Sequence, residues 1–101
     1  MKRLIILPFA ETDIKDTIYY YKEISDTLEK DFIKILDLSF LEIMKNPDSF
    51  PKVKYDIRKF VVNKFPYCIF YVDDKEAIYV LAVFHDKRNP KDWVKRRKSI
   101  K

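Results

Sequence analysis

The chain has 101 residues, 48% of them hydrophobic, and a formal net charge of +5; this length indicates one domain, residues 1–101, with a core but no deep enclosed pocket. Glycine is absent, which excludes Walker A loops, dinucleotide-binding fingerprints and nucleophile elbows, because all three need glycine. Cys68 is the only cysteine, so we expect no disulfide, no zinc or other metal site, and no cofactor.

Two helices are predicted in the first half of the chain, after a short strand over residues 2–8 that Pro8 closes. Apolar residues at helical spacing predict a first helix over about 10–24. Ser25 and Asp26 offer an N-cap for a second helix, which ends near Asn46-Pro47 because the residue before a proline avoids helical geometry. The break is short, so the two helices should form an antiparallel hairpin.

The second half of the chain is predicted to consist mainly of strands. Residues 48–56 are predicted to be a loop, and three strands follow over 57–62, 66–72 and 77–84. Their short connections indicate an antiparallel meander, and a last short helix is predicted over 93–98. The order strand, helix, helix, strand, strand, strand predicts an α+β fold, with the helical hairpin packed on one face of a small twisted sheet.

The positive charge is concentrated in two segments. Residues 52–64 hold five basic residues and one acid, residues 85–101 hold eight and two, and the remaining residues sum to −5. This segregation indicates a polyanionic partner, either a nucleic acid or an acidic protein segment. The alternative is a solvated, lysine-rich surface.

The second predicted helix is apolar on more than one side, through Ile33, Leu38, Phe40 and Leu41. An amphipathic helix with one solvent-exposed face carries apolar side chains only on its buried face, so these residues are not explained by packing on a sheet alone. Either the helix is largely buried, or they form a partner-binding patch.

Short motifs at the element boundaries carry a resemblance to a known family. They are Asn46-Pro47, Ile57-Arg58, Phe65-Pro66-Tyr67-x-Ile69-x-Tyr71, Val83-Phe84-His85-Asp86-Lys87-Arg88, Pro90 and Trp93. In order and spacing, together with the predicted element order, the chain resembles the RelE/ParE superfamily of toxins over nearly its whole length.

The resemblance implies the toxin of a type II toxin–antitoxin system, a plasmid stabilisation protein neutralised by a cognate antitoxin. No apolar run approaches the roughly 20 residues that span a bilayer, so we expect a cytoplasmic protein without membrane contact. RelE-like members cut messenger RNA in the ribosomal A site without a metal, whereas ParE-like members poison DNA gyrase. The fold does not choose between them. We expect a ribosome-dependent endoribonuclease that arrests growth, with gyrase poisoning as the alternative and an inactive binding subunit as a third hypothesis.

Metal-free RNA cleavage needs a base, an acid and cations that stabilise the phosphorane. His85, the only histidine, suits proton transfer, and RelE-like relatives place a catalytic histidine near this position. The planar fork of Arg58 suits phosphate, and Arg88 and Tyr67 complete the predicted catalytic set. The alternatives are a strand-end histidine bonded to backbone, an arginine that ties the preceding loop to the sheet, and packing of Tyr67 and Tyr71 under the helical hairpin.

Further cations are predicted to bind RNA: Lys54, Lys59, Lys64, Lys87, Arg96 and Arg97. The basic run 95–98 would equally serve binding to gyrase or to an acidic antitoxin segment. Leu38, Phe40 and Leu41 are predicted to bind the antitoxin.

Overall fold

A computed structural model describes residues 1–100 of the chain; Lys101, the last residue of the basic C-terminal segment, lies outside the described residues. The helices are α1 (Pro8–Ile24), α2 (Asp26–Lys45), α3 (Pro90–Val94) and the 3-10 helix η1 (Lys95–Ser99). The strands are β1 (Arg3–Ile6), β2 (Lys52–Lys54), β3 (Ile57–Val61), β4 (Tyr67–Asp73) and β5 (Ala77–His85).

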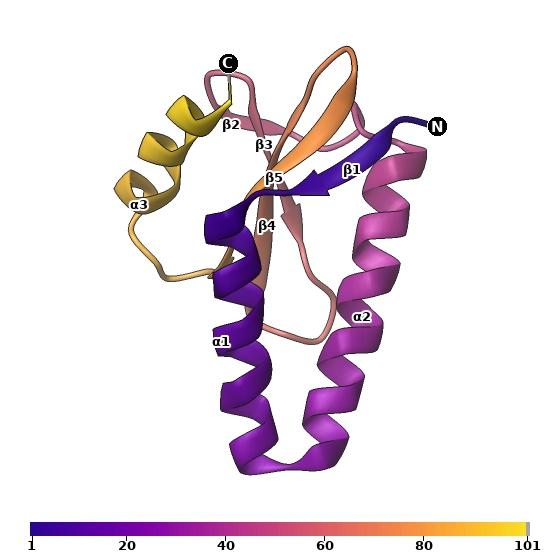
Figure 1. Cartoon of the computed structure of the whole chain (residues 1–101), viewed down its shortest axis with the longest axis vertical. Helices are drawn as coiled ribbons and strands as arrows, with labels where there is room; N and C mark the ends of the chain where they lie inside the picture. The colour runs from indigo at the N-terminus through magenta and orange to yellow at the C-terminus, as the bar shows by residue number, and fades with distance from the viewer. Residues whose placement is uncertain (101) are drawn as a thin grey trace.

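Helices α1 and α2 form the predicted hairpin (Figure 1). α1 begins two residues earlier than predicted, because Pro8 lies in its first turn instead of closing the strand; proline is tolerated there since the N–H that it lacks would be unpaired anyway. Ser25 caps α2 as predicted, and its hydroxyl accepts hydrogen bonds from the N–H groups of Thr27 at 3.1 Å and Leu28 at 3.4 Å. Ser25 alone separates the helices, so they turn back antiparallel.

The predicted meander is confirmed, because β3, β4 and β5 pair antiparallel in that order within a sheet β1-β5-β4-β3-β2. β1 lies parallel to β5, with Arg3 opposite Ala77. The prediction of a plain loop over 48–56 is wrong, since β2 pairs with β3 at the edge of the sheet. All three residues of β2 are exposed and its register shifts, so this strand has none of the alternation that marks a half-buried strand.

The sheet is covered on both faces. The helical hairpin packs on one face, where Phe32 and Ile43 meet Ile69 and Tyr71. The other face carries a second apolar cluster, which Trp93 of α3 covers together with Val94 and Ile100. The helical hairpin therefore packs on one face as predicted, while the C-terminal helices form a third layer on the opposite face (Figure 1). β4 and β5 are buried on both sides, which explains their continuous apolar runs.

None of the helices within residues 1–100 has the length and apolarity needed to cross a bilayer.

Candidate functional site

A cleft of about 460 Å³ lies between the β2–β3 side of the sheet and the C-terminal helix. Its floor is formed by Phe70 and Trp93, whose rings stack with centroids 4.3 Å apart. Four of the residues predicted to act on RNA line this cleft: His85, Arg88, Lys54 and Lys59. The structure thus brings together side chains from β2, β3, the end of β5 and the turn that follows it, up to 34 positions apart in the sequence.

His85 is the last residue of β5, and its half-exposed ring lies edge-on to Tyr67 at 5.5 Å between centroids. Its Nδ1 lies 3.2 Å from the backbone nitrogen of Lys87 and 3.0 Å from Oδ1 of Asp86. The two contacts exclude one another, because Lys87 N–H donates only to an unprotonated Nδ1 whereas the carboxylate needs a protonated one. Nδ1 therefore has one partner when it carries a proton, the Asp86 carboxylate, and another when it does not, the Lys87 N–H.

Arg88 lies at the turn between β5 and α3. Its guanidinium stacks over the ring of Phe84 at 3.8 Å, and Nε donates to Oδ2 of Asp92 at 3.2 Å. A smaller hollow of about 160 Å³ on the α1 side is lined by Arg88, His85 and Tyr67. Asp13 and Asp16 line the same hollow, so carboxylates oppose phosphate binding on that side of His85.

Arg58 lies apart from this group. Its Nη1 donates to the backbone carbonyl of Phe50 at 2.6 Å and to that of Asp48 at 3.3 Å. The structure therefore favours the alternative that Arg58 ties the preceding loop to the sheet, and its fork is directed at carbonyls of its own chain.

Arg96 and Arg97 hold the C-terminal segment in place. Arg96 pairs with Asp13 at 2.7 Å, with side chains only 14% and 10% exposed, and donates to the Leu81 carbonyl at 3.1 Å. Arg97 forms two bonds of 2.8 Å with Asp56, which lower the pKa of that carboxyl and raise the pKa of the guanidinium. Both arginines were predicted to bind RNA, and in the structure both are engaged with carboxylates of their own chain.

The two tyrosines of β4 pack toward the helical hairpin. Tyr71 is fully buried, and its hydroxyl donates to the Pro47 carbonyl at 2.7 Å; burial raises its pKa to about 12. Tyr67 is half-buried against Tyr21 and Phe32. The predicted alternative of packing under the hairpin is thus confirmed for Tyr71, whereas Tyr67 keeps one edge beside His85.

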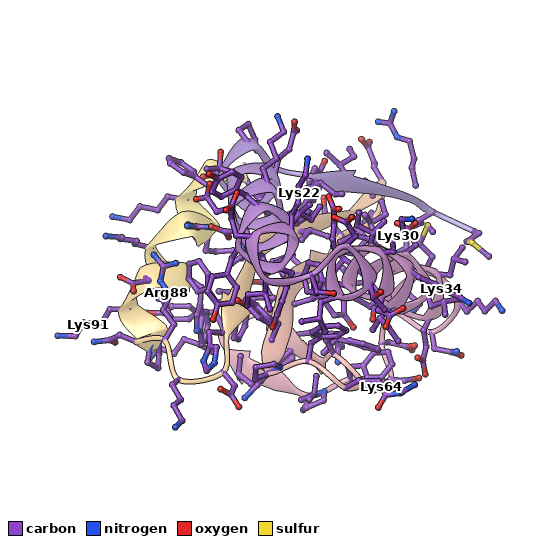
Figure 2. All side chains as sticks on the ribbon, turned by 90° about the horizontal axis from the view of Figure 1, so that it is seen from below. Lys22, Lys30, Lys34, Lys64, Arg88 and Lys91 are labelled. Carbon is purple, nitrogen blue, oxygen red and sulfur yellow. The ribbon has the colours of Figure 1, made fainter. Side chains whose placement is uncertain are left out.

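Lys64 and Lys87 lie outside the cleft. Lys64 borders a different groove, of about 490 Å³, beside α2, and Figure 2 shows it well separated from Arg88 and Lys91. Lys87 is exposed in the turn after β5.

The predicted antitoxin-binding residues do not share one surface. Leu38 and Leu41 are 53% and 46% exposed, but Phe40 is only 8% exposed and packs in the core. The expectation of a patch containing Phe40 is therefore corrected: the exposed apolar side chains of α2 are Ile33, Leu38 and Leu41. Leu38 also lines the groove that contains Lys64.

A comparison of the sequence with models of protein families shows which family the chain belongs to. The model described as ParE toxin of type II toxin-antitoxin system, parDE, matches residues 4–90. The chain belongs to the ParE toxin family. A solved structure of a chromosomal ParDE toxin–antitoxin system from P. aeruginosa is similar in fold, with a TM-score of 0.60 at 16% identity, over 84% of this chain and 96% of that one. Among curated proteins, none matches the sequence.

The match to the ParE family model ends at Pro90, the first residue of α3, so the rest of α3 and the whole of η1 lie beyond the matched residues. Three residues of the cleft wall that sequence reasoning did not single out are Val53, Lys91 and Val94. Val53 lies in the strand taken for a loop, and the other two lie in the C-terminal helix. The one sequence feature that could have indicated these three residues is the basic composition of the two segments in which they lie, 52–64 and 85–101.

Proposed function

We propose that this ParE-family toxin poisons DNA gyrase and is neutralised by a cognate antitoxin. The observation that carries the proposal is the ParE family match over residues 4–90, because gyrase poisoning is the activity that the resemblance implies for ParE-like members.

The arrangement of the predicted catalytic residues supports this choice over RNA cleavage. Arg58, one of the predicted catalytic residues, is engaged with two carbonyls, and Arg96, which was predicted to bind RNA, is engaged with Asp13. A transition state with a phosphorane needs preorganised cations directed at the developing charge. Arg58, the cation predicted to contact phosphate, is instead directed at carbonyls of its own chain, which supports the gyrase proposal.

The decisive experiment compares two assays on the same purified toxin. We expect inhibition of gyrase supercoiling, with accumulation of cleaved DNA, and no cut in messenger RNA on programmed ribosomes. His85→Ala should leave gyrase inhibition within about threefold of wild type, since no proton transfer is required of the toxin. Unaffected supercoiling at saturating, folded toxin would overturn the proposal.

Ribosome-dependent cleavage of messenger RNA remains the second candidate, because His85, Arg88, Lys54 and Lys59 line one cleft. In that case His85→Ala should lower single-turnover cleavage by about 10²–10⁴-fold, as expected for loss of a general acid or base. Lys34→Ala, which changes a lysine of α2 outside the cleft, is the matched control and should leave cleavage unchanged.

Either target predicts growth arrest when the toxin is expressed without its antitoxin. Colony counts after induction test this, with the amount of soluble toxin confirmed in the same cells. Normal growth at high levels of soluble, folded protein would contradict the toxin assignment for this chain.

A further inference from the structure

The cleft beside His85 continues as a longer groove. A second, shallow depression of about 600 Å³ lies between the β2–β3 turn and η1, and it shares Lys91 and Val94 with the cleft. Together the two are lined by seven cations and one carboxylate, that of Asp86. The cations are Lys54, Lys59, Arg88, Lys91, Lys95, Arg97 and Lys98.

Two further carboxylates beside the groove are already paired with its arginines. Asp92 accepts from Arg88 and Asp56 accepts from Arg97. Among residues 1–100, no ion pair is recorded for the five lysines of the groove. The lysines therefore present a net positive surface to an incoming polyanion.

Tyr55 stands at the wall of this groove, in the turn between β2 and β3. Its side chain is 72% exposed, and the Nζ of Lys54 lies 5.2 Å from its ring centroid. Its φ of 52° lies in the left-handed region, which is unfavourable for a residue with a bulky side chain. Glycine or asparagine would fit this backbone with less strain, so folding alone does not account for an aromatic residue here.

The turn that carries Tyr55 is braced against the C-terminal helix. The two bonds of Arg97 to Asp56, the residue after Tyr55, join the β2–β3 turn to η1 across the base of the groove. Both walls are therefore held at a fixed separation, which reduces the ordering cost of binding an extended ligand.

We propose that this groove binds single-stranded nucleic acid, with the lysines contacting successive phosphates and the Tyr55 ring stacking on a base. Proteins that bind single strands without sequence preference combine a basic groove with exposed aromatic rings. An acidic peptide would pair with the lysines, but it would not explain why the exposed Tyr55 ring is held in a strained turn. The binding uses phosphates and a base face, which RNA and DNA share, and it is independent of the gyrase proposal.

The test measures fluorescence anisotropy of a labelled oligothymidylate of about 15 nucleotides, with the full-length toxin and no gyrase present. Tyr55→Ala and Tyr55→Asn should each weaken binding about tenfold, whereas Tyr55→Phe should retain nearly wild-type affinity because the ring remains. Asparagine tolerates the left-handed backbone, so this variant separates loss of stacking from loss of folding.

A salt titration separates stacking from charge. Lys91→Ala combined with Lys95→Ala removes two phosphate contacts, so the slope of log affinity against log salt should fall by about 1.4 for a single strand. Tyr55→Ala should leave that slope unchanged. The matched controls are Tyr19→Ala, which removes an exposed tyrosine from α1, and Lys34→Ala, on the side away from Lys91 (Figure 2); neither should alter binding.

Three outcomes would overturn the proposal. One is an affinity for a duplex of the same length equal to that for the single strand. Another is binding that is indifferent to Tyr55→Ala and Tyr55→Asn in folded protein. The third is displacement of the oligonucleotide by polyglutamate at equal charge concentration, which would assign the groove to an acidic protein segment.

Discussion

The arginines of this toxin differ in function according to what their guanidinium groups contact. Arg58 is directed at two loop carbonyls, Arg96 at the partly buried carboxylate of Asp13, and Arg97 at the carboxylate of the β2–β3 turn. Among the arginines described within residues 1–100, Arg88 is the one that combines a local ion pair with a half-exposed position at the edge of the cleft. An arginine that satisfies carbonyls or carboxylates of its own chain contributes to stability, and removing it leaves those acceptors without a partner.

Arg58→Ala should therefore destabilise the protein. Losing the donors to Phe50 and Asp48 should cost about 1–3 kcal/mol of unfolding free energy, measured by urea denaturation. Arg58→Lys keeps one charged donor and should lose less. Lys59→Ala, at the next position of β3, should change stability by less than about 0.5 kcal/mol. Equal stability of Arg58→Ala and wild type would show that the two carbonyls do not need the arginine.

Tyr71 makes stability depend on alkaline pH. Its pKa is raised to about 12 from an ordinary value of 10.0 because burial disfavours the phenolate. The folded state thus holds the proton more tightly than the unfolded chain, so this contribution is complete below pH 10 and is lost as the pH rises toward 12. The loss should reach roughly 3 kcal/mol.

Tyr71→Phe is the matched control for that effect. It should remove this component of the alkaline loss, while costing about 1 kcal/mol at neutral pH through the hydrogen bond to Pro47. Denaturant titrations of both proteins across the alkaline range measure the difference. Parallel stability curves for the two proteins would contradict the assignment to Tyr71.

The cations and tyrosines of the site could be identified from the sequence, but the groups within the protein that they contact could not. His85 and Arg88 were identified because a strand end and a following turn are visible in the pattern, and both line the cleft. The engagement of Arg96 with Asp13 joins residues 83 positions apart. Such a pairing depends on how the C-terminal segment crosses the sheet, which local periodicity does not encode.

At the scale of elements, α2 carries its apolar residues on two surfaces. Phe32, Leu36 and Ile43 pack on the sheet, whereas Leu38 and Leu41 face outward. The helical boundaries were predictable because Ser25 and Pro47 mark them. β2 was not, since a short exposed edge strand is defined by its pairing with β3 and not by a burial pattern.

The outward surface of α2 should be covered by the antitoxin. Leu38→Asp with Leu41→Asp should weaken the toxin–antitoxin complex by at least about tenfold, since each change places a charge where apolar surface would be buried. The mutant should fold normally, because both side chains are exposed in the free toxin. Isothermal titration calorimetry measures the affinity.

The control for the titration of the Leu38 and Leu41 variant is a double substitution on α1. Tyr19→Asp with Tyr20→Asp alters two exposed side chains of similar size, and binding weakened only by the α2 pair would support the α2 surface. Unchanged affinity of the Leu38 and Leu41 variant, or equal losses for both pairs, would exclude α2 as a specific antitoxin surface.

At the scale of the whole molecule, parts of the two basic segments of the sequence meet on one side. Residues from 53–59 and from 85–98 line the same continuous groove, while the helical hairpin lies on the opposite face of the sheet (Figure 1). The C-terminal layer therefore has two roles. It supplies one wall of the groove, and it covers the second apolar cluster of the sheet through Trp93.

The C-terminal layer should control access to Cys68, which is fully buried in that second cluster and whose thiol pKa is raised by burial. Reaction of Cys68 with a thiol reagent therefore reports opening of this face. Trp93→Ala removes most of the cover and should cost about 3–5 kcal/mol of unfolding free energy, so the thiol should react roughly 100-fold faster or more if the layer opens locally.

Ile43→Ala, a buried change on the hairpin side, is the control and should destabilise the protein by about 2–5 kcal/mol without opening this face. Equal acceleration in both variants, at matched stability, would mean that Cys68 is reached only by global unfolding and that the C-terminal layer does not move independently of the sheet.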